Sequence, residues 1–172
     1  MNQNQDGTPG GDYLNISAPD DALVAAAEQS DDVNESSYVL LMFTSAGDVV
    51  IPGDAHDQSW DVAFRWHERF LQNCALLVAP HHGRDSDRDY EFLDVLRSKL
   101  TLMGCAPAEH MSYASWRNRG LNFITNNQAG CIRVDIEGRR LSVWVENEAY
   151  ARARGLNVNV RNSQGFVGVG YY

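Results

Sequence analysis

Two short polar clusters hold the residue types best suited to metal or acid–base chemistry in this chain. The first follows an apolar run at residues 49–51 and reads Pro-Gly-Asp-Ala-His-Asp over 52–57. The second follows an apolar run at 75–79 and reads Pro-His-His-Gly-Arg-Asp-Ser-Asp over 80–87. Loops at strand ends are where layered α/β proteins gather their ligand sites. A carboxylate and one or two imidazoles at neighbouring strand ends are suitable ligands for zinc, manganese or iron.

Each cluster also has a structural interpretation that the residue types alone do not exclude. Asp54 follows a glycine, so its carboxylate can cap the helix that comes next. His81 or His82 can hydrogen-bond the backbone instead of binding a ligand. His67 lies inside an amphipathic segment and is expected to be structural, whereas His110 lies in a polar loop and suits either role.

Apolar runs of strand length alternate with segments of helical spacing, which predicts an α/β domain. We predict strands over 38–43, 49–51, 75–79, 100–103, 122–125, 131–136 and 141–145, with hairpins joining the first two and the last two. We predict helices over 57–71, 91–96, 112–119 and 146–154, and a weak strand or a mobile tail over 156–172. The clusters at 52–57 and 80–87 should therefore lie where two strands end.

The charge of the chain is concentrated at its start. The net charge of the 172-residue chain is −9, and residues 1–36 hold eight of the 23 acids and none of the 14 Lys and Arg residues. We expect residues 1–36 to form a mostly disordered acidic leader or the interior loop of a parent protein, with residues 37–155 forming the domain. A nearly neutral body argues against non-specific nucleic-acid binding, which needs a basic face.

The cysteines and the hydropathy indicate a cytoplasmic protein. Cys74, Cys105 and Cys131 are odd in number, widely spaced and set among apolar residues, so we expect reduced, buried thiols. The sequence contains no stretch of the roughly 18–20 apolar residues that a membrane span needs, and no signal peptide is evident.

Four segments, in this order, resemble the second half of a metallo-β-lactamase-fold hydrolase. They are Asn-Glu-Ser-Ser-Tyr-Val-Leu-Leu at 34–41, Gly-Asp-Ala at 53–55, Leu-Val-Ala-Pro-His-His-Gly-Arg-Asp-Ser at 77–86 and Ile-Thr-Asn-Asn-Gln-Ala-Gly at 124–130. The most similar branch is the hydrolase domain of DNA-uptake competence proteins and their stand-alone relatives. The resemblance covers about residues 34–136 and implies half of an αββα sandwich.

The resemblance also implies a site with two metal ions, usually zinc, that activates water for hydrolysis, often of phosphodiesters. Asp54 matches the family's bridging carboxylate, and His82 matches its last histidine ligand, with His81 as a neighbouring or alternative ligand. From their positions, Arg84 and Ser86 are candidates to contact a phosphate oxygen, and His110 is a candidate proton donor or substrate contact.

The family's His-x-His-x-Asp-His motif, which supplies most of about six metal ligands, is absent from this sequence. Three explanations remain open: a fragment of a longer protein, one half of a split enzyme, or a non-catalytic interaction module that retains half of the fold. A half fold exposes an apolar face, to which Trp60, Phe64 and Trp66 are candidates to belong. We therefore expect the partner to be the second half of the fold or a second copy, and the chain alone to be inactive.

Overall fold

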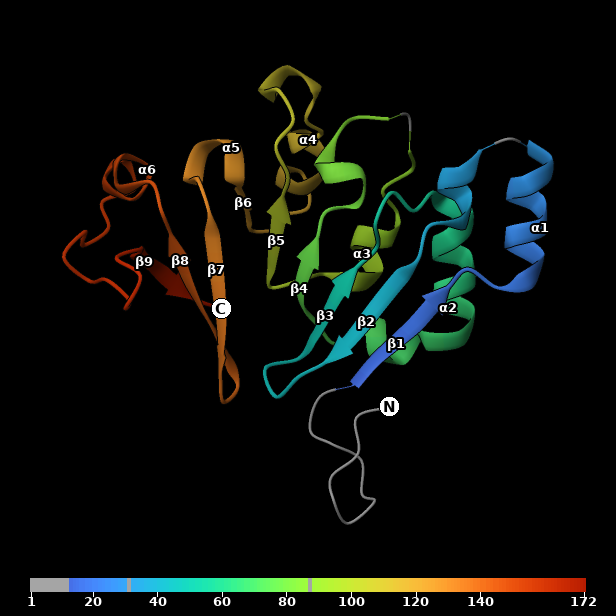
Figure 1. Cartoon of the computed structure of the whole chain (residues 1–172), viewed down its shortest axis with the longest axis horizontal. Coiled ribbons are helices and arrows are strands. Elements are labelled where there is room, and N and C mark those ends of the chain that lie inside the picture. The colour runs from blue at the N-terminus through green and yellow to red at the C-terminus, as the bar shows by residue number, and fades with distance from the viewer. Residues whose placement is uncertain (1–12, 31, 87) are drawn as a thin grey trace, which may run out of the picture.

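A mixed sheet of six strands forms the centre of the fold in the computed structural model, which describes residues 13–30, 32–86 and 88–172 (Figure 1). Its order follows the chain: β1 (Tyr13–Ala18), β2 (Val39–Phe43), β3 (Asp48–Ile51), β4 (Cys74–Val78), β5 (Leu100–Met103) and β6 (Phe123–Thr125). Strands β1, β2 and β3 pair antiparallel, and β3 to β6 pair parallel. The carboxyl ends of the four parallel strands therefore meet at one edge, as expected for an α/β domain.

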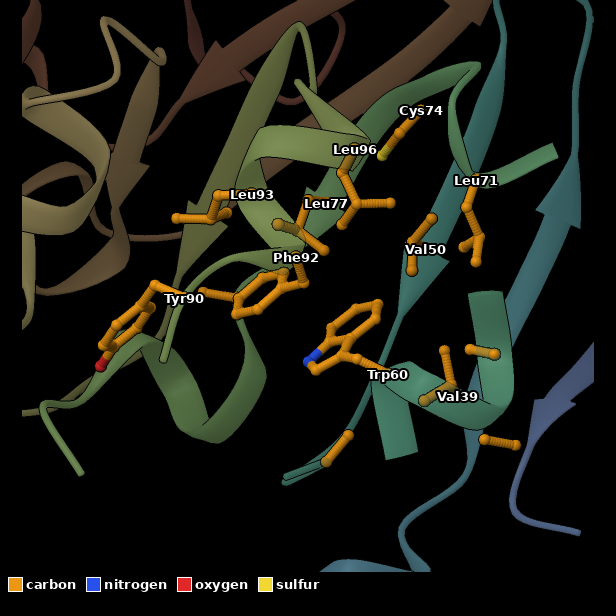
Figure 2. Close-up of a cluster of buried hydrophobic side chains, with 14 of the residues drawn as sticks. Val39, Val50, Trp60, Leu71, Cys74, Leu77, Tyr90, Phe92, Leu93 and Leu96 are labelled. Carbon is orange, nitrogen blue, oxygen red and sulfur yellow. The ribbon is translucent and has the colours of Figure 1, made fainter. Parts of the chain in front are cut away.

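Helices cover one face of this sheet. The longest is α2 (Asp57–Leu71), whose buried side chains lie at helical spacing and pack with those of α3 (Phe92–Leu96) and α4 (Tyr113–Arg117). Figure 2 shows the centre of this core, where the Trp60 ring stacks on Phe92 with centroids 4.5 Å apart. Helix α1 (Asp21–Ser30) and the short turn η1 (Val33–Ser36) also pack near α2.

A second, antiparallel sheet covers part of the opposite face. It has the order β7-β8-β9, formed by β7 (Ile132–Glu137), β8 (Arg140–Val145) and β9 (Val167–Tyr171). Its inward residues Leu141, Val143 and Val145 are buried in one cluster with Val49 and Leu76 of the larger sheet. The short helix α5 (Asn126–Ala129) contacts β6, and the short helix α6 (Glu148–Ala153) contacts β9 and α5.

The α/β fold class and the elements from residue 38 onward confirm the sequence prediction. Helix α2 has the predicted bounds, the other predicted helices and strands are present within a few residues, and the tail supplies β9. None of the helices within the described ranges is long and apolar enough to cross a membrane.

The prediction of a mostly disordered leader over 1–36 is wrong for the part that the structure describes. Strand β1 pairs with β2 along its length, and Ala18 and Leu23 lie in the core. The Asp20 carboxylate accepts a hydrogen bond from the Leu23 N–H at 2.9 Å, so this acid stabilises the start of α1. The leader prediction for residues 1–12 lies outside the described residues.

Two predictions about single side chains are also corrected. Cys74 is buried, but Cys105 and Cys131 are exposed because they lie in loops beyond strand ends. Trp60 is a core residue and Phe64 is half-buried against the same cluster, so of these three predicted residues only Trp66 is exposed.

Candidate functional site

The two polar clusters lie side by side at the carboxyl edge of the parallel strands. Gly53 and Asp54 follow β3, and the turn η2 (Pro80–Gly83) follows β4. The His81 N–H donates a hydrogen bond to the Gly53 carbonyl at 3.0 Å, which joins the two loops directly. The structure therefore brings Asp54 into the neighbourhood of His81 and His82, as the sequence predicts for residues at adjacent strand ends.

The histidine pair is held in a backbone conformation that L-residues rarely adopt. His81 and His82 have φ values of +49° and +61°, and Gly83 follows with +82°. Such a conformation costs roughly 1–2 kcal/mol for each non-glycine residue, so it persists only where the surroundings fix it. Here the Gly104 N–H donates to the His82 carbonyl at 2.9 Å, and the Ser112 N–H donates to the Gly83 carbonyl at 3.0 Å.

The position of the His82 side chain requires a residue without a β-carbon at position 104. A β-carbon on Gly104 would lie 2.7 Å from the His82 Cβ and 2.9 Å from its Nδ1. The Nδ1 side of the His82 ring thus rests against the backbone at the end of β5. The His82 side chain as a whole is exposed.

His81 is more enclosed than His82. Its Nδ1 is buried and has no hydrogen-bond partner among the described residues. Burial lowers the pKa of His81, and the positive charge of Arg88 lowers it further, while Asp54 opposes both effects. The His81 imidazole is therefore neutral at pH 7, the form that binds metals or accepts a proton.

A third loop, after β5, carries His110 to the same edge. The Asp85 N–H donates to the His110 carbonyl at 2.8 Å, and Arg84 forms an isolated bridge with Met111. The side chains of Arg84 and His110 are exposed, whereas the Ser86 hydroxyl is buried without a partner among the described residues. The three candidate substrate-contacting residues therefore lie on two loops that are joined by backbone hydrogen bonds.

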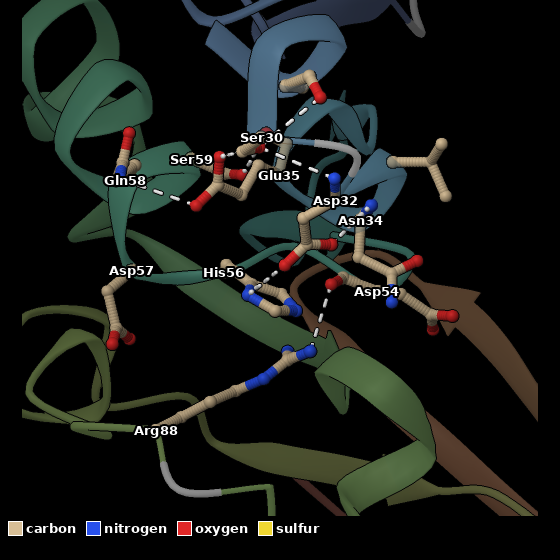
Figure 3. Close-up of polar contacts among 12 residues, drawn as sticks. Ser30, Asp32, Asn34, Glu35, Asp54, His56, Asp57, Gln58, Ser59 and Arg88 are labelled. Atoms are coloured by element: carbon tan, nitrogen blue, oxygen red, sulfur yellow. Dashed lines mark hydrogen bonds and ion pairs between the residues drawn. The ribbon is translucent and has the colours of Figure 1, made fainter.

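Arg88, which sequence reasoning missed, supports the loop that holds Asp54 (Figure 3). Its buried guanidinium donates hydrogen bonds to the carbonyl oxygens of Asp54, at 3.0 Å, and of Ala55. Burial lowers the pKa of Arg88, and the charges of Tyr90, Asp54, Asp57 and Asp32 oppose this. In the sequence, Arg88 belongs to a run of alternating charges that is typical of a solvated loop, so no local signal identifies it.

The capping interpretation of Asp54 is wrong. Helix α2 begins after His56, and no side chain caps it. His56 instead pairs with Asp32, with 3.6 Å between its Nδ1 and the Asp32 Oδ2. For one ring nitrogen of the histidine pair, the buried Nδ1 of His81, no described residue supplies a hydrogen bond. The Asp54 carboxylate is half-buried, and the His82 side chain is exposed.

The donors do not amount to a complete metal centre. Within residues 13–30, 32–86 and 88–172, no group of three or more His, Cys, Asp and Glu side chains is placed to hold a metal ion. Asp54, His81 and His82 therefore do not form such a group by themselves, and a site with two ions needs more ligands than these. We therefore assign no chemical step to a metal in this chain alone.

No protein-family model matches this chain, and no curated protein matches it.

Proposed function

We propose that this chain carries the second half of a metal-dependent hydrolase site that acts on phosphodiesters. The missing ligands would come from another polypeptide segment bearing a His-x-His-x-Asp-His motif. The observation that supports this most is the backbone hydrogen bond from His81 to Gly53, which unites the Gly-Asp loop and the His-His-Gly loop at one sheet edge. The resemblance in the order of these motifs suggests the reaction class.

The side chains divide into donors and substrate contacts. Asp54 offers a carboxylate that caps no helix, and His81 offers a buried Nδ1 to which no described residue bonds. His82 offers an exposed imidazole. Zinc, when bound, would supply Lewis-acid chemistry and lower the pKa of a bound water toward about 7, and manganese or iron suits the same ligands. Arg84 supplies an exposed guanidinium that suits a phosphate oxygen.

A cytoplasmic location is part of this proposal. It rests on the three free cysteines, two of which are exposed. Thiols of this kind stay reduced in the cytoplasm, where disulfides are rare.

Zinc titration of the metal-free chain, followed through the ring signals of the histidines by NMR, tests the proposal. We expect weak binding that shifts the His81 and His82 signals, with no hydrolysis of bis(4-nitrophenyl) phosphate. Asp54→Ala and His82→Ala should each weaken binding by about tenfold or more, because each removes one of a few ligands. Asp61→Ala, an exposed acid on α2, is the matched control and should change nothing.

Two results would reject the proposal. The first is zinc binding that is unaffected by Asp54→Ala and His82→Ala, which would place the metal elsewhere. The second is close to two ions per chain with turnover that these variants abolish, since the chain would then hold a complete site.

A further inference from the structure

The two sheets of the sandwich differ in width, and the difference exposes apolar residues on the larger one. Val49 of β3 is buried beneath the second sheet, and its cross-strand partner Met42 on β2 packs against the same cluster. The next residue of that row, Leu14 on β1, is 64% exposed. The second sheet therefore ends above β2, while the larger sheet continues to β1.

A neighbouring row shows the same pattern. Ile16 on β1 pairs with Leu40 on β2, which pairs with Ile51 on β3. Ile16 is 53% exposed, Ile51 is 36% exposed and Tyr38, two residues before Leu40, is 62% exposed. We call Leu14, Ile16, Tyr38, Leu40 and Ile51 the open face. It continues the buried interface between the sheets, and large contiguous apolar patches of this kind mark interaction surfaces.

The free edge of β7 adjoins the open face. Strand β7 is an edge of the second sheet, and the turn after it contacts the turn between β2 and β3 through a hydrogen bond from Ser45 to the Gly138 carbonyl. Strand β9, at the other edge, lies near β6, since Val169 and Tyr172 line one pocket with Phe123 and Ile124. The edge that points toward the open face is therefore that of β7.

The hydrogen-bond pattern identifies which groups that edge presents. Leu141 on β8 exchanges both backbone hydrogen bonds with Tyr172, so the next β8 residue, Ser142, directs its own groups to Asp135 on β7. By alternation, Arg133 and Glu137 also face β8. Ile132, Val134 and Ile136 direct their N–H and C=O groups outward, and no described residue bonds to them. Unpaired groups of this kind are a template for a further strand.

We propose that the β7 edge and the open face together dock an amphipathic β-strand of another polypeptide. The strand extends the second sheet by hydrogen bonds to Ile132, Val134 and Ile136, and its apolar side chains cover Leu14 and Ile16. This mode is β-strand addition, in which main-chain bonds give affinity and alternate side chains give specificity. The proposal holds whether or not the strand-end loops bind a metal.

A second copy of this chain does not fit as the occupant. Antiparallel pairing of β7 with itself places the two-fold axis perpendicular to the sheet, so both larger sheets would lie on the same side. Each larger sheet extends past β7 toward the other copy, so the two would collide. Parallel pairing puts them on opposite sides and leaves both open faces uncovered.

Two displayed peptide libraries of about ten residues, the usual upper length of a strand, test the proposal on the full chain in buffer with a metal chelator. One library alternates apolar and polar residues with period two, and the other has the 3.6-residue pattern of an amphipathic helix. We expect only the first to be enriched. Asp54→Ala should bind its peptides unchanged, which separates this surface from the proposed hydrolytic site.

The best peptide then serves as a defined probe. Ile16→Lys should weaken its binding by about tenfold or more, whereas Val24→Lys, at a partly exposed position on α1, should change it by less than about twofold. N-methylation of alternate peptide residues along one edge should also abolish binding. Amide exchange of Ile132, Val134 and Ile136 should slow on binding, while that of Arg133 and Asp135 stays as it was.

Three results of the peptide experiments would overturn the proposal. They are the absence of any enriched peptide, enrichment of the helical library alone, and binding that Ile16→Lys leaves intact. A concentration-dependent dimer in which the same three β7 amides are protected would also overturn it, because the occupant would then be a second copy.

Discussion

Replacing Arg88 with methionine tests whether the buried guanidinium fixes the loop that carries Asp54. The substitution keeps most of the volume of the side-chain stem and removes the two hydrogen bonds to the Asp54 and Ala55 carbonyls. The carbonyl of the buried residue Ala55 loses its partner, at about 2 kcal/mol, and that of the half-buried Asp54 regains water, at about 1 kcal/mol. The variant no longer has to bury the guanidinium charge, which recovers about 1 kcal/mol. We therefore expect the free energy of unfolding to fall by about 2 kcal/mol in total.

Urea unfolding measures this loss, provided that the slope of the transition is unchanged. Arg65→Met is the matched control, because Arg65 is an exposed arginine 3.8 Å from Asp20 and should contribute no more than about 1 kcal/mol. A second readout is the pKa of His81, which Arg88 lowers and which should therefore rise in the variant. A stability equal to that of Arg65→Met, with the His81 pKa unmoved, would refute the role assigned to Arg88.

Three further changes have outcomes set by the contacts of one residue each. Gly104→Ala places its β-carbon against the His82 ring and should cost about 1–3 kcal/mol by urea unfolding while shifting the His82 NMR signals; unshifted signals would contradict the contact. Thr101→Val removes the hydroxyl that accepts the Trp116 indole N–H at 2.9 Å, and a loss below about 0.5 kcal/mol, instead of the expected 1–3 kcal/mol, would contradict its role. Because the His81 pKa is lowered on folding, the unfolded chain takes up its proton first, and the free energy of unfolding should fall as pH drops below about 6.5. His81→Asn, whose side chain tolerates the same backbone conformation, should flatten that slope, and an unchanged slope would assign it to another group.

The fold from residue 38 onward was predictable because its signals are local. Helix α2 shows apolar residues at helical spacing, and its Trp60 and Ala63 are buried as that spacing implies. The residues of β1 carry no such local signal. They form a strand because they pair with β2, more than twenty residues later in the chain, and composition does not show that pairing. The acids around it argued for a loop, although Asp20 acts as a helix cap.

The location of the candidate site could also be predicted from the sequence, but the contacts that support it could not. Strand ends identified the loops of Asp54 and His81, because parallel strands bring their carboxyl ends together wherever the sheet forms. The supporting contacts were hidden, since Arg88 and the His56–Asp32 pair join positions more than twenty residues apart. A run of alternating charges gives no indication that one of its members is buried.

A second argument for the proposal that the strand-end loops bind a ligand is the conflict between residue type and backbone conformation at His81 and His82. Glycine or asparagine adopts left-handed backbone conformations at lower cost, yet two imidazoles stand there in succession. The His81 Nδ1 is buried, and no described residue supplies it with a hydrogen bond. Local and global preferences usually agree in a folded chain, and the exceptions gather at functional sites. The bonds from Gly104 and Ser112 hold this turn in place, so the fold maintains a costly conformation in the loop that is hydrogen-bonded to the Gly53–Asp54 loop.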